Sequence, residues 1–162
     1  MTRALTADFD APRDDRFFED YQVGAKYSYG SIAVTEAEIV EFGRRFDTQS
    51  IHTDPVAAAA GPFGGLIASG IHTFAMMMRL LADHYISANA SLASPGIDEL
   101  RWPAPVRPGD ELSLTATVAS ARRSKSRPDR GLVHTSVELF NQHGQVVLTL
   151  TAMNFIRCRE TG

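Results

Sequence analysis

The segment over residues 70–86 is the feature of this sequence that most restricts the possible folds. Apolar side chains occupy nearly the whole circumference of the helix that it would form, and Arg79, Asp83 and His84 interrupt them in its second half. A helix that is apolar on almost every side is normally buried, and this one is too short and too interrupted to span a membrane. The sequence therefore predicts one long helix enclosed by the rest of the chain.

Strand-like segments lie before and after this helix. They cover residues 26–34, 97–102, 112–118, 133–139 and 146–156. Apolar and polar side chains alternate along several of them, which is typical of half-buried strands, and the short turns between the late strands indicate antiparallel pairing. We therefore expect an α+β fold in which one curved antiparallel sheet wraps around the long helix. The side of the helix away from the sheet would need a second cover, which a dimer partner could supply.

Length and composition indicate a single globular domain. The chain has 162 residues, of which 44% are hydrophobic and 22% are charged, which is ordinary for a globular protein with a real core. Residues 1–16 are polar, acidic and without periodicity. We therefore expect a flexible N-terminal arm over residues 1–16 and one domain over residues 17–162.

Charge and cysteine content restrict the partners and the compartment. The formal net charge of −3, with no basic face along the chain as a whole, argues against nucleic acid as a partner. Cys158 is the only cysteine, so a disulfide framework is excluded and a reducing compartment is indicated. The first residues lack the apolar centre of a signal peptide. We therefore expect a cytoplasmic protein that contacts neither nucleic acid nor a membrane.

Two side chains suited to proton transfer, Asp47 and His52, lie five residues apart between two predicted short helices. The first helix begins at the capping box of Thr35 and Glu38, and the second begins at Asp54, with a proline behind it. The C-terminal end of the first helix should raise the proton affinity of Asp47, and the N-terminal end of the second should keep His52 neutral. Groups pushed in opposite directions in this way are typical of acid–base sites.

A glycine-rich run follows and leads into the long helix at Gly70. The N–H of Gly70 has no intrahelical partner, so it could bind negative charge that develops on a substrate oxygen. Gly65 would allow close approach of the backbone, Ser69 is expected to cap the helix, and Gln49 either braces its loop or contacts the substrate. These four residues are the candidates for substrate binding.

A metal site is not expected. His52, Asp54 and His72 are the side chains nearest to a ligand set, but their spacing matches no strong metal signature.

Three motifs together resemble the MaoC-like dehydratases, which include the (R)-specific enoyl-CoA hydratases. The stretch Asp47–Pro55 is similar to their usual D-x-N-P-x-H-x-D, although Gln49-Ser50 stand where Asn-Pro is usual. Residues 63–70 resemble the glycine-rich segment before the central helix, and residues 100–110 resemble a later strand and loop. The resemblance covers roughly residues 17–157.

This resemblance implies a hot-dog fold, usually dimeric, in which short extra helices hold the site. It implies that Asp47 and His52 add water to, or remove it from, an acyl thioester of coenzyme A in fatty acid metabolism. We expect no cofactor beyond the coenzyme A of the substrate itself. The acyl group stays open, although the flexible side chains of Met76 and Met77 could wall an adaptable pocket.

Two other functions remain open. Hot-dog thioesterases usually place a working carboxylate on the central helix, and residues 71–82 contain none. A non-catalytic acyl-CoA-binding protein would be expected to lose Asp47 or His52, and both are present.

One basic cluster, which includes Arg122, Arg123 and Lys125, interrupts a generally acidic chain. Such a cluster in a polar hairpin is either a solvated loop or, here, a partner for the phosphates of coenzyme A.

Overall fold

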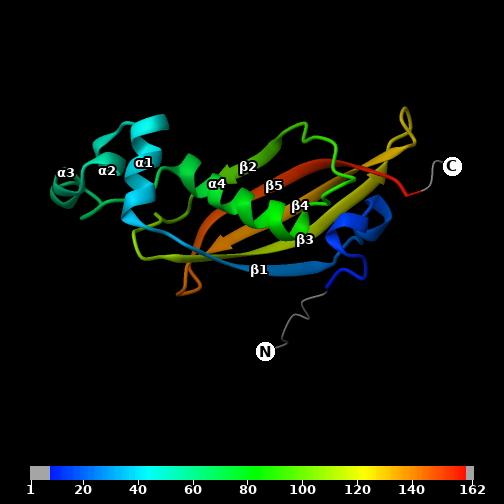
Figure 1. Cartoon of the computed structure of the whole chain (residues 1–162), viewed down its shortest axis with the longest axis horizontal. Coiled ribbons are helices and arrows are strands. Elements are labelled where there is room, and N and C mark those ends of the chain that lie inside the picture. The colour runs from blue at the N-terminus through cyan, green and yellow to red at the C-terminus, as the bar shows by residue number, and fades with distance from the viewer. Residues whose placement is uncertain (1–7, 160–162) are drawn as a thin grey trace.

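Five strands form one antiparallel sheet in the computed structural model, which describes residues 8–159 (Figure 1). The order across the sheet is β1-β3-β4-β5-β2. The strands are β1 (Lys26–Ala33), β2 (Ile97–Arg101), β3 (Glu111–Arg123), β4 (Arg130–Phe140) and β5 (Val146–Arg157). The helical elements are η1 (Arg13–Asp15), η2 (Phe18–Asp20), α1 (Glu36–Phe46), α2 (Ser50–Thr53), α3 (Pro55–Ala60), α4 (Gly70–Leu80) and the π-helix η3 (Leu81–Tyr85). The sheet curves around α4, so the predicted α+β hot-dog arrangement is confirmed.

Matched rows of apolar side chains on the inner face of the sheet form the core. Leu114 on β3 lies opposite Leu139 on β4, and Leu139 lies opposite Leu148 on β5. All three side chains are buried. Burying one leucine contributes about 1.5–3 kcal/mol, so this alternation, visible in the sequence, fixes which face of each strand meets the helix.

The long helix buries one side and exposes the other. His72, Thr73, Met76, Met77 and Leu80 are the buried residues of α4. By contrast, Ile71 is 55% exposed and Met78 is 38% exposed. The expectation that the sheet alone leaves part of this helix uncovered is therefore confirmed for the single chain.

The last turn of the predicted helix is wider than an α-helix. In η3 the N–H of Ile86 donates to the carbonyl of Leu81 at 2.8 Å, five residues back. The carbonyl of Tyr85 accepts hydrogen bonds from the side chains of Tyr21 and Arg16. These side chains tie η3 to the N-terminal part of the chain.

Residues 8–16 pack against the domain, which differs from the expected flexible arm. The ring of Phe9 stacks on Tyr27 with centroids 4.0 Å apart and also contacts Tyr85. Arg16 is buried and donates to the carbonyl oxygens of His84 and Tyr85. The expectation for residues 1–7 lies outside the described residues. A single phenylalanine and one arginine give no periodic signal, which is why the sequence did not reveal this docking.

Three short helices lie together at one end of the sheet (Figure 1). The predicted caps are confirmed, because Thr35 accepts from the N–H of Glu38 and Asp54 accepts from two N–H groups of α3. The helix α2 between them was not predicted. In residues 8–159, no helix combines the length and the apolar character that crossing a bilayer requires.

Candidate active site

Asp47 and His52 meet where α1, α2 and the start of α4 come together. Asp47 is the C-terminal cap residue of α1. His52 lies inside α2, two residues before the cap of α3 as expected, and its Nε2 is 3.3 Å from Oδ2 of Asp47. The predicted acid–imidazole pair therefore exists as a direct contact.

The close approach of α1 to α2 depends on Gly43. A Cβ atom at this position would lie 2.9 Å from the carbonyl oxygen of His52 and 2.9 Å from a methyl carbon of Thr53. No side chain fits there without movement of α2. The sequence analysis missed this glycine because it lies inside a helix, where nothing in the pattern distinguishes it.

A hydrogen bond at Nδ1, the ring nitrogen that does not face Asp47, fixes the orientation of His52. Its Nδ1 lies 2.7 Å from the carbonyl oxygen of Ile67, and a carbonyl can only accept, so Nδ1 bears a hydrogen. In the neutral ring, Nε2 is then an acceptor that faces the carboxylate of Asp47. A water molecule that lies beside these two atoms could donate one hydrogen bond to each.

Two side chains hold the carboxylate of Asp47. Nε2 of Gln49 donates to Oδ1 at 2.8 Å, and Oγ of Ser69 donates to Oδ2 at 2.7 Å. These bonds, with Gln49 the larger contributor, lower the pKa of Asp47 below its ordinary value. The expected rise in proton affinity is therefore wrong, because direct donors to the carboxylate outweigh the dipole at the end of α1.

Ser69 and Gly70 form the start of α4, but not as expected. Ser69 occupies the cap position, yet its hydroxyl makes no capping hydrogen bond. Among the described residues, none accepts from the N–H of Gly70, and its carbonyl accepts from the indole of Trp102 at 2.9 Å. A Cβ on Gly70 would lie 2.7 Å from the Trp102 ring. Trp102 is thus a wall of the site that the sequence analysis did not identify.

A cavity of about 510 Å³ opens onto these groups, within the usual range for small-molecule sites. Its lining includes five of the predicted site residues: Asp47, Gln49, His52, Ser69 and Gly70. Phe63, Ile71, Trp102 and the segment 103–106 complete most of its apolar wall.

Gly65 does not line this cavity. Its nearest neighbour would be the guanidinium of Arg107, 3.5 Å from a Cβ at this position. Arg107 also donates to the carbonyl of Phe63 at 2.7 Å and so holds the glycine-rich loop. Gly65 therefore belongs to the support of the site, and its predicted contact with substrate stays a prediction.

The basic cluster lies away from the site in one chain. Arg122 and Arg123 end β3 and Lys125 lies in the turn before β4. This turn is at the opposite end of the sheet from α1, α2 and α3 (Figure 1). One chain therefore does not bring these side chains to Asp47 and His52, and their contact with coenzyme A stays a prediction.

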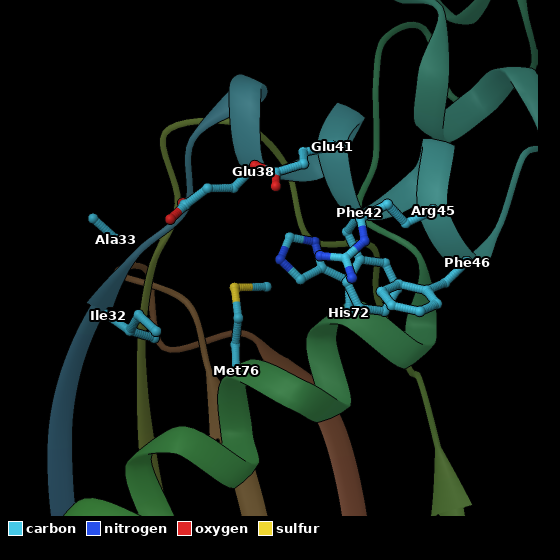
Figure 2. A pocket seen from close by; sticks show the side chains of 9 residues that line it. All are labelled: Ile32, Ala33, Glu38, Glu41, Phe42, Arg45, Phe46, His72 and Met76. Carbon is cyan, nitrogen blue, oxygen red and sulfur yellow. The ribbon is translucent and has the colours of Figure 1, made fainter.

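A second hollow, of about 210 Å³, lies between α1, α4 and the end of β1 and shares no lining residue with the first (Figure 2). His72 lines it, stacked on Phe42 with centroids 4.7 Å apart. Burial lowers the pKa of His72. Glu38, Glu41 and Arg45 at its rim are exposed surface side chains, so it lacks the convergent catalytic groups of the first cavity.

Within residues 8–159, no cluster of three or more His, Cys, Asp or Glu side chains could hold a metal ion. His52 faces the first cavity and His72 faces the second hollow.

The fold and these side chains define a hot-dog domain with an aspartate–imidazole site at the start of its central helix. The family described as MaoC like domain matches residues 20–139, and the chain belongs to this family.

Known proteins agree with this assignment. The chain is 34% identical over 110 residues to the 3-hydroxyacyl-thioester dehydratase Z of Mycobacterium tuberculosis, covering 67% of this chain and 73% of that protein. The structure also resembles the crystal structure of the MaoC-like dehydratase from Rhodospirillum rubrum, with a TM-score of 0.83 and 42% sequence identity. The match covers 90% of this chain and 99% of that chain. The R-hydratase PhaJ1 from Pseudomonas aeruginosa is 26% identical, with a TM-score of 0.69, and covers 89% of this chain and 86% of that chain.

Proposed function

We propose that the protein catalyses the reversible addition of water to a trans-2-enoyl-CoA thioester, or equally the dehydration of the (R)-3-hydroxyacyl-CoA. One observation supports this most. The carboxylate of Asp47 and the imidazole of His52 meet at 3.3 Å on the wall of a cavity that the backbone of Gly70 also lines. Relatives named as a dehydratase of 3-hydroxyacyl thioesters and as an R-hydratase agree with this reaction class.

The chemistry follows from the two acceptors that face each other. A water molecule that donates one hydrogen to Asp47 and one to His52 is polarised as a nucleophile. As the water oxygen bonds to C3 of the enoyl group, one proton passes to Nε2 of His52. The carbonyl oxygen of the thioester then gains negative charge. The N–H of Gly70 stabilises that oxygen. The resulting imidazolium, balanced by the Asp47 anion, then delivers a proton to C2 and completes the addition.

The direct test is to mix the purified protein with crotonyl-CoA. Hydration removes the conjugated double bond, so the absorbance of the enoyl thioester should fall without release of free thiol. Free thiol would instead indicate a thioesterase. Binding of the thioester without either change would indicate a non-catalytic acyl-CoA-binding protein.

Side chains on one face of α4 offer a path for the acyl group. Gly70 and Thr73 line the site cavity, and Phe74, Met77, Met78 and Leu81 line an apolar cavity of about 300 Å³. These positions are spaced i, i+3, i+4, i+7, i+8 and i+11, so they share one face of a helix. Met76, expected in the acyl pocket, lines the second hollow instead. We propose that the acyl tail follows this face from the site into the apolar cavity.

Replacing Met78 by Trp should narrow that cavity. Met78 is partly exposed, so the larger ring can be accommodated without overpacking the core. We expect kcat/KM for trans-2-octenoyl-CoA to fall by about tenfold or more relative to crotonyl-CoA, because a few lost methylene contacts are worth this much. Val56→Trp, at an exposed position on α3, is the matched control. An unchanged ratio of the kcat/KM values for the two substrates would contradict the proposed acyl path.

We also propose that the working unit is a homodimer in the cytoplasm. Ile71, Ile97 and Trp102 are exposed apolar side chains beside the two cavities, and β2 is an edge strand. A second copy of the chain would cover this surface. Sedimentation analysis should then give twice the mass of the chain, and a monomer would contradict the proposal.

A further inference from the structure

The side chain of Ser69 does not cap α4, although Ser69 occupies the cap position. A serine at a helix cap normally accepts from the N–H of the second or third helical residue. Here the Ser69 side chain is buried at 1% exposure, and its hydroxyl donates to Oδ2 of Asp47 at 2.7 Å, across 22 residues of sequence. The backbone of Ser69 is itself fixed, because its carbonyl accepts from the N–H of Thr73 at 2.9 Å.

This orientation has two consequences at once. A hydroxyl has one hydrogen, and donating it to a carboxylate favours the anion over the acid. A capping hydroxyl would accept from Ile71 or His72, the second and third residues of α4. Because Ser69 does not cap, no described residue accepts from the N–H of Ile71, and the N–H of Gly70, the first helical residue, is open as well. Those groups thus stay available at the positive end of the helix, where a developing oxyanion is stabilised.

We propose that Ser69 is a positioning residue that couples the two halves of the site: it holds Asp47 ionised and aimed at His52, and it leaves the N–H of Ile71 open beside that of Gly70 for the thioester oxygen. This inference rests on the proposed hydration, and Ser69 acts through Asp47 and through the backbone rather than on the reacting atoms.

The hydrogen bond to Oδ2 also explains the geometry with His52. Oδ2 receives the Ser69 hydrogen and is the oxygen nearest to Nε2 of His52, while Gln49 binds the other oxygen. Donors on both oxygens prevent rotation of the carboxylate. A buried serine is the more constant of the two donors, because Gln49 is exposed.

Ser69→Ala is the test, and Ser50→Ala is its matched control. Ser50 is an exposed serine on the neighbouring α2, and the side-chain hydrogen bonds to Asp47 come from Gln49 and Ser69 instead. We expect Ser69→Ala to lower kcat for crotonyl-CoA roughly ten- to hundredfold, the range for a hydrogen bond to a charged group. The acid limb of the pH profile should move to higher pH, because Asp47 loses a donor that lowers its pKa.

A double-variant cycle separates positioning from simple structural support. If Ser69 acts through Asp47, then Ser69→Ala should change kcat much less in the Asp47→Asn background than in the wild type. An acid limb that does not move, or an equal loss of kcat in both backgrounds, would overturn the proposal.

A titration that needs no turnover keeps this proposal distinct from the proposed function. Carbon-13 NMR of labelled aspartate carboxyl groups, with Asp47 identified by its absence in Asp47→Asn, should show a higher pKa for Asp47 in Ser69→Ala than in the wild type. An unchanged pKa overturns the role of Ser69. If the wild type does not hydrate any enoyl-CoA, the proposed function fails, and this titration still decides whether Ser69 controls the charge of Asp47.

Discussion

Asp47→Asn should lower kcat/KM for the hydration of crotonyl-CoA by roughly 10²–10⁴-fold, the usual contribution of one acid–base group. The amide has nearly the shape of the carboxylate, but it has no negative charge with which to polarise the water or to balance an imidazolium on His52. His52→Gln should cause a loss of the same order, because the amide can still donate to the carbonyl of Ile67 but cannot take up the proton. The decisive measurement is steady-state hydration together with the thermal unfolding temperature of each variant.

Asp54 provides the control for this experiment. It belongs to the same short stretch of sequence, but its carboxylate caps α3 by accepting from the N–H groups of Val56 and Ala57. Asparagine is an equally good cap, so Asp54→Asn should retain both activity and unfolding temperature. Near-native turnover in Asp47→Asn or His52→Gln would refute the assignment of the catalytic pair.

Gly43→Ala should reduce kcat/KM by up to about 10²-fold, although Gly43 does not touch the substrate cavity. The added Cβ would lie 2.9 Å from the carbonyl oxygen of His52, so α2 must shift and carry His52 with it. Misplacement of a reacting group by about 1 Å can cost 10²-fold in rate. Two effects on stability compete: alanine favours a helix over glycine by about 1 kcal/mol, whereas overpacking costs about 1–3 kcal/mol. We therefore expect slightly lower stability as well.

Gly61→Ala is the comparison for this variant. Gly61 follows α3, and its nearest contact to an added Cβ would be 3.4 Å, with no positive φ angle. The substitution should leave kinetics and unfolding temperature nearly unchanged. If Gly43→Ala hydrates crotonyl-CoA as fast as Gly61→Ala does, then the spacing of α1 and α2 does not control the position of His52.

The elements of the fold were predictable from local patterns. Alternation in β3 and β4 identified the inward residues Leu114 and Leu139, and the caps Thr35 and Asp54 located α1 and α3. These signals depend on neighbours within a few residues, which a sequence displays directly. The π-helix η3 was not predictable, because its end depends on Tyr21 and Arg16 from a distant part of the chain.

The residues of the site were more predictable from the sequence than the pKa shift of Asp47. The spacing of Asp47 and His52 predicted a pair, and the pair is in contact. The predicted direction of the Asp47 pKa shift was wrong. The larger contributor, Gln49, is local, but its sequence position does not show that its side chain donates to the carboxylate, and the second donor, Ser69, lies 22 residues away. Trp102 escaped notice for the same reason, since only the folded chain brings its indole to the carbonyl of Gly70.

The docking of Phe9 bears on where this domain may be cut. The family match begins at residue 20. A protein shortened to that point would lose Phe9, whose ring stacks on Tyr27, and Arg16, whose guanidinium donates to the carbonyl of Tyr85. Both contacts support the C-terminal end of the central helix, whereas Asp47 and His52 lie at its N-terminal end. Truncation points, fusion junctions and protease sites should therefore be placed upstream of Phe9.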